Sequence, residues 1–282
     1  MTDDLSALIT AATAADGQPP FSDQSLVDYS TGIRRLLTVG AVGSLEGTET
    51  FGAALVEVRG GCTEAELVVH PDARRHGLGE RLVSDVIAMA NGALLVWAHG
   101  DHPAARVLAE RYTFTPVREL LQLRSVVRID GRTSTSSANA IRPFRPGSDD
   151  AAWLDLNAQA FADHAEQGKM TQHDLDARKA EAWFDAGDFL LLWDDDELIG
   201  FCWLKVGGGL GEFYAVGVAP GRQGEGIGRV LVEAGLNRLA ERGIRESNLY
   251  VEADNEPAVR LYRSYGFTNH TVDVQYRRDG QP

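Results

Sequence analysis

The stretch AVGVAPGRQGEGIGRVLV, residues 215–232, joins an apolar run to a glycine-rich turn with two arginines and then to an apolar pattern at helical spacing. Such a turn between a strand and a helix has three interpretations: a bare turn, a dinucleotide-binding loop, or another kind of phosphate-binding loop. Glycine lets the backbone adopt positive φ and approach a ligand closely. The first N–H groups of a helix, together with the helix dipole, favour an anion.

Two of the known phosphate-binding patterns do not fit this turn. The dinucleotide fingerprint fails because Leu231 stands where the third glycine is required. The loop of the nucleotide hydrolases fails because no Gly-Lys-Ser/Thr follows. A phosphate-binding turn of a different type therefore stays open beside the bare turn, with Arg222 and Arg229 able to add charge-assisted hydrogen bonds.

The same arrangement occurs earlier in the chain, in ELVVHPDARRHGLGERLVSDVIAMA at 66–90. One constant offset matches its valine, proline, two glycines and following apolar pair to those of the later stretch. A second pair, HPAARVLAERYTF (102–114) and EPAVRLYRSYGF (256–267), also corresponds, with one residue inserted near the end. Two copies so far apart indicate two domains of similar fold rather than a solenoid. The repetition also disfavours the bare turn.

The joint between the copies is a small, polar segment without apolar periodicity, DGRTSTSSANA at 130–140, which is typical of a linker. We therefore expect an amino-terminal domain over 1–130, a linker over 131–140 and a carboxy-terminal domain over 141–282.

In the second half, FLLLWDDDELIGFCWLKV (189–206) predicts two strands joined by an acidic turn. Helical spacing predicts a helix over 227–242, and a proline in the first turn marks a short one from 256. Strands followed by strand–helix units predict an α/β (α+β) fold in each half, with a mixed central sheet flanked by helices.

Composition excludes several classes of function. The formal net charge of −14 argues against nucleic-acid binding and suits a cationic substrate better. We find no apolar run that could span a bilayer and no signal peptide, so we expect a cytoplasmic protein. Cys62 and Cys202 lie far apart, and the histidines lack an ordered set of partners, so we expect neither a disulfide framework nor a metal.

The pattern Gln223-x-x-Gly226-x-Gly228, after a V-x-V strand and before the N-x-x-A segment Asn255 to Ala258, resembles the GCN5-related N-acetyltransferases (GNAT). Arg74-x-x-Gly77-x-Gly79 is a second version, so the resemblance covers nearly the whole chain as a tandem pair. It implies acetyl-CoA as co-substrate, with its pyrophosphate at the turn. The acetyl-CoA-binding residues that it implies are, in the second half, Val216, Gly217, Val218, Gln223, Gly224, Glu225, Gly226, Ile227, Gly228, Arg229, Asn255, Glu256, Pro257, Ala258, Val259 and Arg260, and in the first half, Leu67, Val68, Val69, Arg74, Arg75, His76, Gly77, Leu78 and Gly79.

A narrower resemblance is to the mycothiol synthases, a group of tandem GNAT enzymes. It rests on the segments AELVVHPDARRHGLG (65–79), WAHG (97–100), EQG (166–168), EAWFD (181–185), GLGE (209–212) and LYVEADNEPAVRLYRSYGF (249–267). It implies acetylation of the cysteinyl amine of a cysteine–glucosamine–inositol conjugate, the last step of mycothiol biosynthesis. The substrate-binding residues that it implies are Asp23, Glu166, Lys205, Glu212 and Tyr250, and Asp23 stands where the family has a glutamate.

Acetyl transfer from a thioester needs a neutral amine, which a nearby carboxylate can produce by removing a proton. Strand N–H groups can stabilise the oxyanion, and a tyrosine can protonate the departing thiolate. Glu212 starts the strand that leads to the turn, and Tyr262 lies in the helix after Asn255, so we expect them to be the base and the acid.

At the offsets of the repeat, the counterparts of Glu212 and Tyr262 are Thr63 and Leu108. The first half is therefore expected to bind acetyl-CoA or only to support the fold. A shifted base at Glu64 or Glu66 stays open.

Two alternative functions remain at this point. One is acetylation of another small amine, such as an aminoglycoside or a polyamine. The other is a non-catalytic module that binds acetyl-CoA and acts as a sensor. The expected partners are acetyl-CoA and a small-molecule amine, without nucleic acid or membrane, and the chain is expected to be a monomer.

Overall fold

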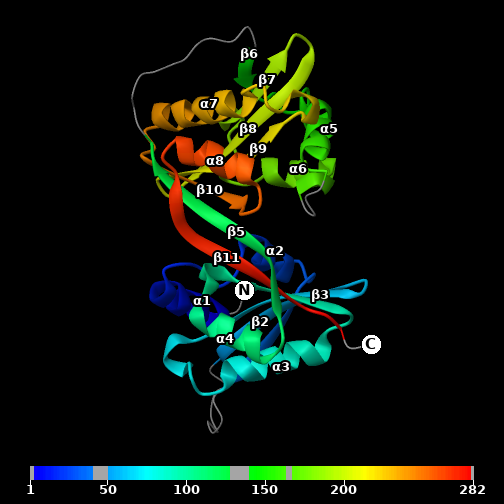
Figure 1. The fold of residues 1–282 in the computed structure, drawn as a ribbon, viewed down its shortest axis with the longest axis vertical. Coiled ribbons are helices and arrows are strands. Elements are labelled where there is room, and N and C mark those ends of the chain that lie inside the picture. Colours follow the sequence, from blue (N-terminus) through cyan, green and yellow to red (C-terminus); the bar gives the residue numbers. More distant parts are fainter. Residues whose placement is uncertain (1–2, 41–49, 128–139, 163–166, 281–282) are drawn as a thin grey trace. The chain divides into compact units, whose positions relative to one another are not determined.

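The computed structural model describes residues 3–40, 50–127, 140–162 and 167–280. They form two compact units (Figure 1). Unit 1 comprises residues 1–121, 252–254 and 271–282, and unit 2 comprises residues 122–251 and 255–270.

The two units contain the following helices and strands. The elements that begin in unit 1 are α1 (Asp3–Asp16), α2 (Asp23–Ser30), β1 (Arg35–Gly40), β2 (Thr50–Arg59), β3 (Cys62–Val69), α3 (Leu78–Met89), β4 (Ala93–Ala98), α4 (Pro103–Arg111) and β5 (Thr115–Val126). Those that begin in unit 2 are β6 (Ala140–Pro143), α5 (Asp150–Ala160), α6 (Gln172–Lys179), β7 (Phe189–Asp194), β8 (Glu197–Gly207), β9 (Leu210–Val218), α7 (Ile227–Glu241), β10 (Glu246–Glu252), α8 (Glu256–Ser264) and β11 (Thr268–Arg278).

The sheet of unit 1 has helices on both faces. Its strands follow the order β1-β2-β3-β4-β11, with β3 and β4 parallel and the other pairs antiparallel. Successive side chains of a strand point to opposite faces. Ala53 and Leu55 of β2 therefore pack with α1, whereas Ala54 and Val56 pack with α3.

Unit 2 has the same plan, with the order β6-β7-β8-β9-β10 followed by residues 122–126 of β5, and with a parallel β9–β10 pair. On one face, the indole of Trp203 in β8 lies edge-on to Trp153 of α5, with ring centroids 5.4 Å apart. On the other face, Gly235 lets α7 approach the sheet, since an added Cβ would lie 2.5 Å from the ring of Phe213. The parallel pair in the middle of each unit is the element that positions the candidate site.

The strands and helices predicted in the second half are confirmed. The acidic turn joins β7 to β8, the helix expected over 227–242 is α7, and the short helix is α8. The mixed sheet with helices in each half is confirmed as well.

The last strand of the chain belongs to the sheet of unit 1, because residues 274–278 of β11 pair with residues 94–98 of β4. Conversely, residues 122–126 of β5 belong to unit 2, where Val127 donates from its N–H to the carbonyl of Arg245 at 2.8 Å. The division into 1–130 and 141–282 stays a prediction, and residues 131–139 of the expected linker lie outside the described residues.

Among the described residues, none of the helices combines the length and the apolar character that crossing a membrane requires.

A buried histidine fastens β11 to β4. Nδ1 of His99 lies 3.0 Å from Asp273 and its Nε2 lies 3.4 Å from Glu66. Burial opposes the charged imidazolium, but the hydrogen bonds and charges of Asp273 and Glu66 outweigh it and raise the pKa of His99 to about 10. Burial likewise opposes ionisation of Glu66, yet His99, Ser25 and Ser22 lower the pKa of Glu66 to about 2. His99 is therefore a cation between two carboxylates at neutral pH.

Replacing His99 by glutamine is expected to lower the free energy of unfolding at pH 7 by about 3 kcal/mol, because two buried carboxylates lose their cation. The raised pKa of His99 means that its stabilisation is complete below about pH 6.5 and declines as the pH rises toward about 10. Urea unfolding at pH 7 and pH 9 should therefore show a decline in the parent that H99Q lacks. The exposed His173 on α6 supplies the control, H173Q. An equal decline in H99Q would contradict the assignment.

Candidate active site

The two glycine-rich turns have the same backbone geometry. Gly77 precedes α3 at φ 81° and ψ −4°, and Gly226 precedes α7 at φ 83° and ψ 5°. Glycine adopts this left-handed conformation readily, whereas a residue with a Cβ is strained there. The turn aims the first N–H groups of each helix out of the helix end, where they have no intrahelical acceptor. Both turns therefore have the geometry of an anion-binding helix start.

The parallel strands next to each turn pair only over their first residues. Within the described residues, β9 and β10 pair from Leu210 to Phe213, although β9 continues to Val218. β3 and β4 pair from Cys62 to Glu66, although β3 continues to Val69. Beyond these points each strand has backbone groups facing away from its antiparallel neighbour. An elongated ligand with amide groups can bond to them, as an added strand does.

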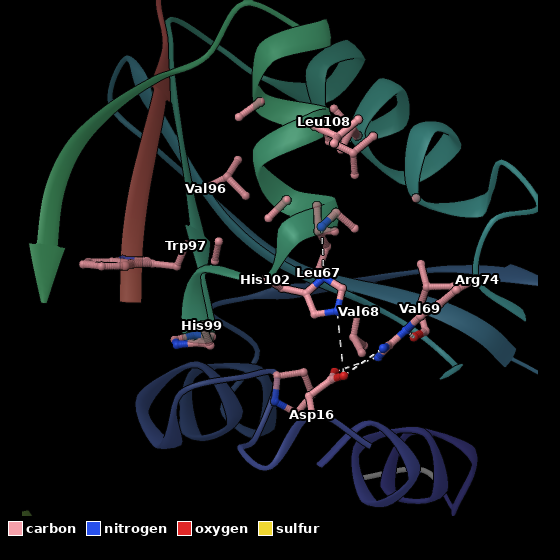
Figure 2. Close-up of a pocket in the computed structure, with 18 of the residues that line it drawn as sticks. Asp16, Leu67, Val68, Val69, Arg74, Val96, Trp97, His99, His102 and Leu108 are labelled. Atoms are coloured by element: carbon pink, nitrogen blue, oxygen red, sulfur yellow. Dashed lines mark hydrogen bonds and ion pairs between the residues drawn. The ribbon is translucent and has the colours of Figure 1, made fainter. Parts of the chain in front are cut away.

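In unit 1 this arrangement forms one side of an open cavity of about 630 Å³. Figure 2 shows residues that line it. That volume is within the range of small-molecule sites. Its walls are the end of β3, the turn before α3, the end of β4 and α4. Of the acetyl-CoA-binding residues predicted in the first half, the cavity is lined by Leu67, Val68, Val69, Arg74, Arg75, Gly77 and Gly79. His76 and Leu78 are not among its lining residues, and Leu78 is buried in the core under α3.

Two cavity residues escaped the sequence analysis because they are far from the turn along the chain. Asp16, at the end of α1, accepts two hydrogen bonds from Arg74 at 2.7 and 2.6 Å. Nε2 of His102, which precedes α4, lies 3.9 Å from the same carboxylate. Figure 2 shows Asp16 between Arg74 and His102. No local pattern pairs residues separated by this length of chain.

In unit 2, the residues predicted to bind acetyl-CoA occupy three places. Val216 to Val218 form the end of β9, and residues 223–229 form the turn and the first residues of α7. Residues 255–260 form the start of α8, where the side chain of Asn255 caps the helix by accepting from the N–H of Ala258 at 3.2 Å. Arg222, beside the turn, is paired with Glu225 and Asp194 at 2.9 Å each. Their assignment to acetyl-CoA stays a prediction.

The structure corrects the pairing of Tyr262 with Leu108. The helices α4 and α8 have equal length, and Tyr112 and Tyr265 follow them with nearly identical backbone angles. A Cβ added to Gly79 would meet Leu108, and one added to the equivalent Gly228 would meet Leu261. Leu108 thus corresponds to Leu261, and no residue is inserted.

This register makes Ala109 the counterpart of Tyr262. Unit 1 therefore lacks the tyrosine hydroxyl, as expected, but at a different residue.

The pairing of Glu212 with Thr63 is also wrong, because β9 contains a bulge. Trp203 of β8 pairs with Ala215 and the next residue, Leu204, pairs with Phe213, so Tyr214 is the extra residue. The β2–β3 pairing of unit 1 runs without a shift. Below the bulge, Glu212 stands opposite Lys205 in the place where Glu64 stands opposite Glu57. The counterpart of Glu212 is therefore Glu64, one of the shifted bases left open above.

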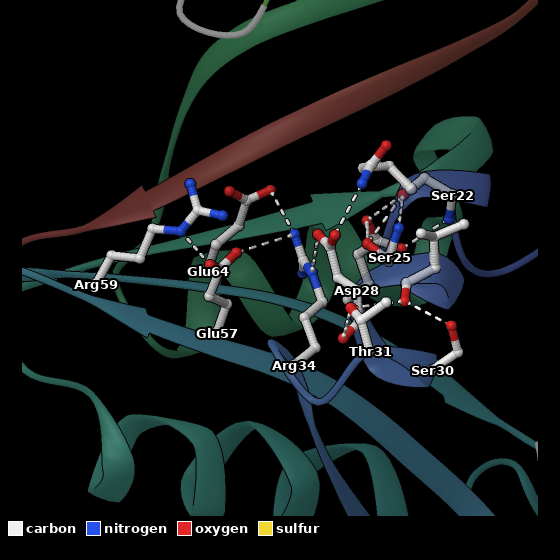
Figure 3. Close-up of polar contacts among 12 residues, drawn as sticks. Ser22, Ser25, Asp28, Ser30, Thr31, Arg34, Glu57, Arg59 and Glu64 are labelled. Carbon is white, nitrogen blue, oxygen red and sulfur yellow. Dashed lines mark hydrogen bonds and ion pairs between the residues drawn. The ribbon is translucent and has the colours of Figure 1, made fainter. Parts of the chain in front are cut away.

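Glu64 belongs to a charge cluster around the buried Arg34, shown in Figure 3. Arg34 is 6% exposed, and its guanidinium lies 3.4 Å from Glu64, 3.6 Å from Asp28 and 3.9 Å from Glu57. Among the described residues, its Nε and Nη1 atoms are buried without a hydrogen-bond acceptor. The carboxylate of Glu64 thus faces a cation of its own chain, a position that an acceptor amine would have to take from Arg34.

The equivalent place in unit 2 combines charged and aromatic side chains. Lys205 and Glu212 are directly opposite across β8 and β9, so their Cβ atoms are about 5 Å apart. Nζ of Lys205 lies 5.6 Å from the ring centroid of Trp183, which is itself 5.2 Å from that of Tyr214. Burial raises the pKa of Tyr214, although Arg178 opposes the shift. Neither Trp183 nor Tyr214 was predicted from the sequence as a site residue. A tryptophan is typical of a hydrophobic core, and the position of Tyr214 depends on the bulge in β9.

Tyr262 is almost completely buried. Its ring centroid lies 5.8 Å from that of Phe267 and 6.5 Å from that of Phe213. Burial, with a smaller contribution from Cys202, raises the pKa of Tyr262 above its ordinary value. The hydroxyl therefore stays protonated at neutral pH, which is the state that a proton donor needs.

The other residues predicted to bind the acceptor lie in different parts of the chain. Asp23 begins α2 in unit 1, and Glu166 lies outside the described residues. Tyr250 of β10 in unit 2 is 45% exposed, and its hydroxyl accepts from Nε2 of Gln122 at 2.7 Å. The substrate roles of these residues stay predictions.

Within the described parts of the chain, no three histidine, cysteine, aspartate or glutamate side chains gather as they would around a metal ion.

Solved structures confirm the fold. A GCN5-related N-acetyltransferase from Sphaerobacter thermophilus has a TM-score of 0.74 at 24% identity and matches 99% of this chain and 92% of its own. A tandem GNAT protein from the clavulanic acid biosynthesis pathway has a TM-score of 0.73 at 16% identity and matches 99% of this chain and 95% of its own.

Sequence relatives are much closer. The model of the Acetyltransferase (GNAT) family matches residues 152–267. A mycothiol acetyltransferase from Kocuria rhizophila is 45% identical, covering 98% of this chain and 95% of the relative. One from Clavibacter sepedonicus is 48% identical, covering 96% and 90%. The chain therefore belongs to the GNAT acetyltransferases and, among them, to the mycothiol acetyltransferase family.

Proposed function

We propose that this protein transfers the acetyl group of acetyl-CoA to the cysteinyl amine of a cysteine–glucosamine–inositol conjugate, the last step of mycothiol biosynthesis. The observation that carries the proposal is the identity of 45% over 98% of the chain to a relative named for this activity. The turn before α7, the partly paired β9–β10 strands and the Lys205–Glu212 face of unit 2 support it.

Unit 2 is the proposed catalytic unit. Acetyl-CoA supplies a thioester whose acetyl carbon an amine can attack directly. Glu212 accepts the proton of the ammonium, so that its nitrogen lone pair becomes available. Strand N–H groups beside the bulge stabilise the oxyanion, since a bulge leaves the ladder locally unpaired and re-aims nearby groups. As the new N–C bond forms and the C–S bond breaks, Tyr262 gives its proton to the sulfur.

The polar residues around Glu212 suit the rest of the acceptor. The ammonium of Lys205 can donate to hydroxyl oxygens of a sugar or cyclitol, while carboxylates and the Tyr250 hydroxyl can accept from them. The ring of Trp183 holds the Lys205 ammonium over its face.

Unit 1 is proposed to bind acetyl-CoA without reacting. The cavity beside its turn supports binding. Three differences from unit 2 argue against reaction: Ala109 replaces the tyrosine, Glu64 faces Arg34, and β3 has no bulge in its pairing with β2. We further infer that the protein acts as a monomer in the cytoplasm.

The direct test is to assay acetyl transfer to the cysteinyl conjugate beside a panel of aminoglycosides and polyamines. Free thiol released from acetyl-CoA and the mass of the product should both report transfer to the conjugate. Higher kcat/KM for another amine would replace the proposed substrate. Thiol release that does not depend on any added amine would indicate a binding module instead of a transferase.

Glu212→Gln is expected to lower kcat by about 100-fold or more, because a glutamine cannot accept the proton. Steady-state kinetics across pH should also show loss of the acidic limb that this carboxylate produces in the parent. Glu64→Gln is the matched control, since Glu64 has the same place in unit 1. Loss of activity in E64Q with activity retained in E212Q would move the base to unit 1.

Tyr262→Phe is expected to lower kcat by about 10- to 100-fold, since the leaving sulfur loses its proton donor, while the KM for acetyl-CoA changes little. Tyr265→Phe is the control, at the residue that follows the same helix. Its hydroxyl bonds to Glu233 at 2.7 Å, so its loss should reduce stability without reducing kcat at a permissive temperature. Equal kcat losses in both variants would point to helix packing instead of proton donation.

A further inference from the structure

The Asp16–Arg74 pair lies inside the cavity of unit 1, at the end formed by the glycine-rich turn. Both carboxylate oxygens of Asp16 accept from the two terminal nitrogens of Arg74, at 2.7 and 2.6 Å. Nε of Arg74 donates to the carbonyl of Val69 at 3.2 Å. Bidentate pairing of this kind is the geometry in which arginine also binds phosphate. The carboxylate of Asp16 thus occupies the two guanidinium nitrogens of Arg74 that a phosphate ligand would use.

The same carboxylate approaches the residue at the start of α4. Nε2 of His102 lies 3.9 Å from the carboxylate of Asp16. Figure 2 marks this ion pair with a dashed line. In unit 2 the corresponding positions hold the amide side chains of Gln223 and Asn255 in place of the arginine and the histidine. The Asp16 contact is therefore a feature in which unit 1 departs from the proposed catalytic unit.

Asp16 also anchors the segment between α1 and α2. Gln18, Pro19 and Pro20 of this segment line the cavity. Its far end is held at Ser22, whose N–H and hydroxyl donate to Glu66 at 2.8 and 2.9 Å. The segment is thus fixed across one side of the cavity at both ends. The Arg74 pair is 22–26% exposed and can exchange with solvent, whereas Glu66 is buried.

We propose that the Asp16–Arg74 pair is a clasp that an anionic ligand of unit 1 must open. A pyrophosphate at the turn competes with Asp16 for the Arg74 fork, and the carboxylate and phosphate charges repel each other. Unit 1 therefore binds polyphosphate ligands more weakly than its turn and helix alone would allow. The clasp rests on the proposed binding of acetyl-CoA by unit 1, and it makes Asp16 the residue that sets the affinity of this second site.

The test isolates unit 1 in a Gly226→Val background. Gly226 has φ +83°, which strains a β-branched residue, so this change should disable the turn of unit 2. Adding Asp16→Asn removes the charge at nearly constant shape. Titration calorimetry at fixed salt should show that coenzyme A and inorganic pyrophosphate each bind with a Kd lower by about tenfold.

Asp72→Asn is the matched control, because it removes the same charge from the same turn. The side chain of Asp72 is 93% exposed and lies 4.0 Å from His70 instead of Arg74. Its effect on the Kd should stay within about twofold, as for other exposed charges. Unchanged or weaker binding in D16N, no binding to unit 1 in either form, or equal tightening in D72N would overturn the clasp. Weaker binding would mean that Asp16 orients Arg74 for the ligand.

An acetyl-transfer assay of the protein with an intact Gly226 tests the proposed function independently of the clasp. If the parent does not acetylate the cysteinyl conjugate, the proposed function fails. Pyrophosphate binding to unit 1 still decides the clasp in that case, because it needs neither the acetyl group nor the acceptor.

Discussion

The parallel pair that starts together and then separates is the constraint from which the candidate site follows. Backbone N–H and C=O groups that leave a ladder must find other partners or water. In unit 2, β9 uses one edge for β8 along its length, while its other edge is paired with β10 only as far as Phe213. Residues 214–218 therefore offer a strand edge that ends at the turn before α7. One elongated ligand can satisfy both the strand edge and the helix start.

The two units share this arrangement of partly paired parallel strands, glycine turn and helix. They differ in β9, which has one more residue than β3 in its pairing with the neighbouring antiparallel strand. Side chains alternate along a strand, so an extra residue such as Tyr214 changes which face the residues beyond it occupy relative to those before it. In unit 2 the bulge puts Glu212 opposite Lys205, a pair of opposite charge. In unit 1 the unshifted ladder puts Glu64 opposite Glu57, and Arg34 supplies the cation from the segment before β1. The acidic position is thus retained in both units, but its charge is balanced from different elements.

The sequence predicted those features that depend on short segments. The glycine turns, α7, α8 and the β7–β8 hairpin each follow from residues close together in the chain, and the repeat then predicted two similar folds. The pairings of Glu212 with Thr63 and of Tyr262 with Leu108 failed because a constant offset ignores a bulge and because helix ends decide the register. The Asp16–Arg74 pair and the placement of β11 beside β4 depend on tertiary contact between distant segments, for which one sequence contains no local signal.

The charges of the chain explain why the backbone matters so much at both turns. With a net charge of −14, the protein has carboxylates available to neutralise its own cations. Arg222 is paired with Glu225 and Asp194 in unit 2, and Arg74 is paired with Asp16 in unit 1. The N–H groups at the starts of α3 and α7 cannot be neutralised in this way, because their polarity comes from the peptide bonds themselves. The helix starts therefore provide the permanent attraction for an anion, and Arg74 and Arg222 contribute only to the extent that the ligand displaces their carboxylates.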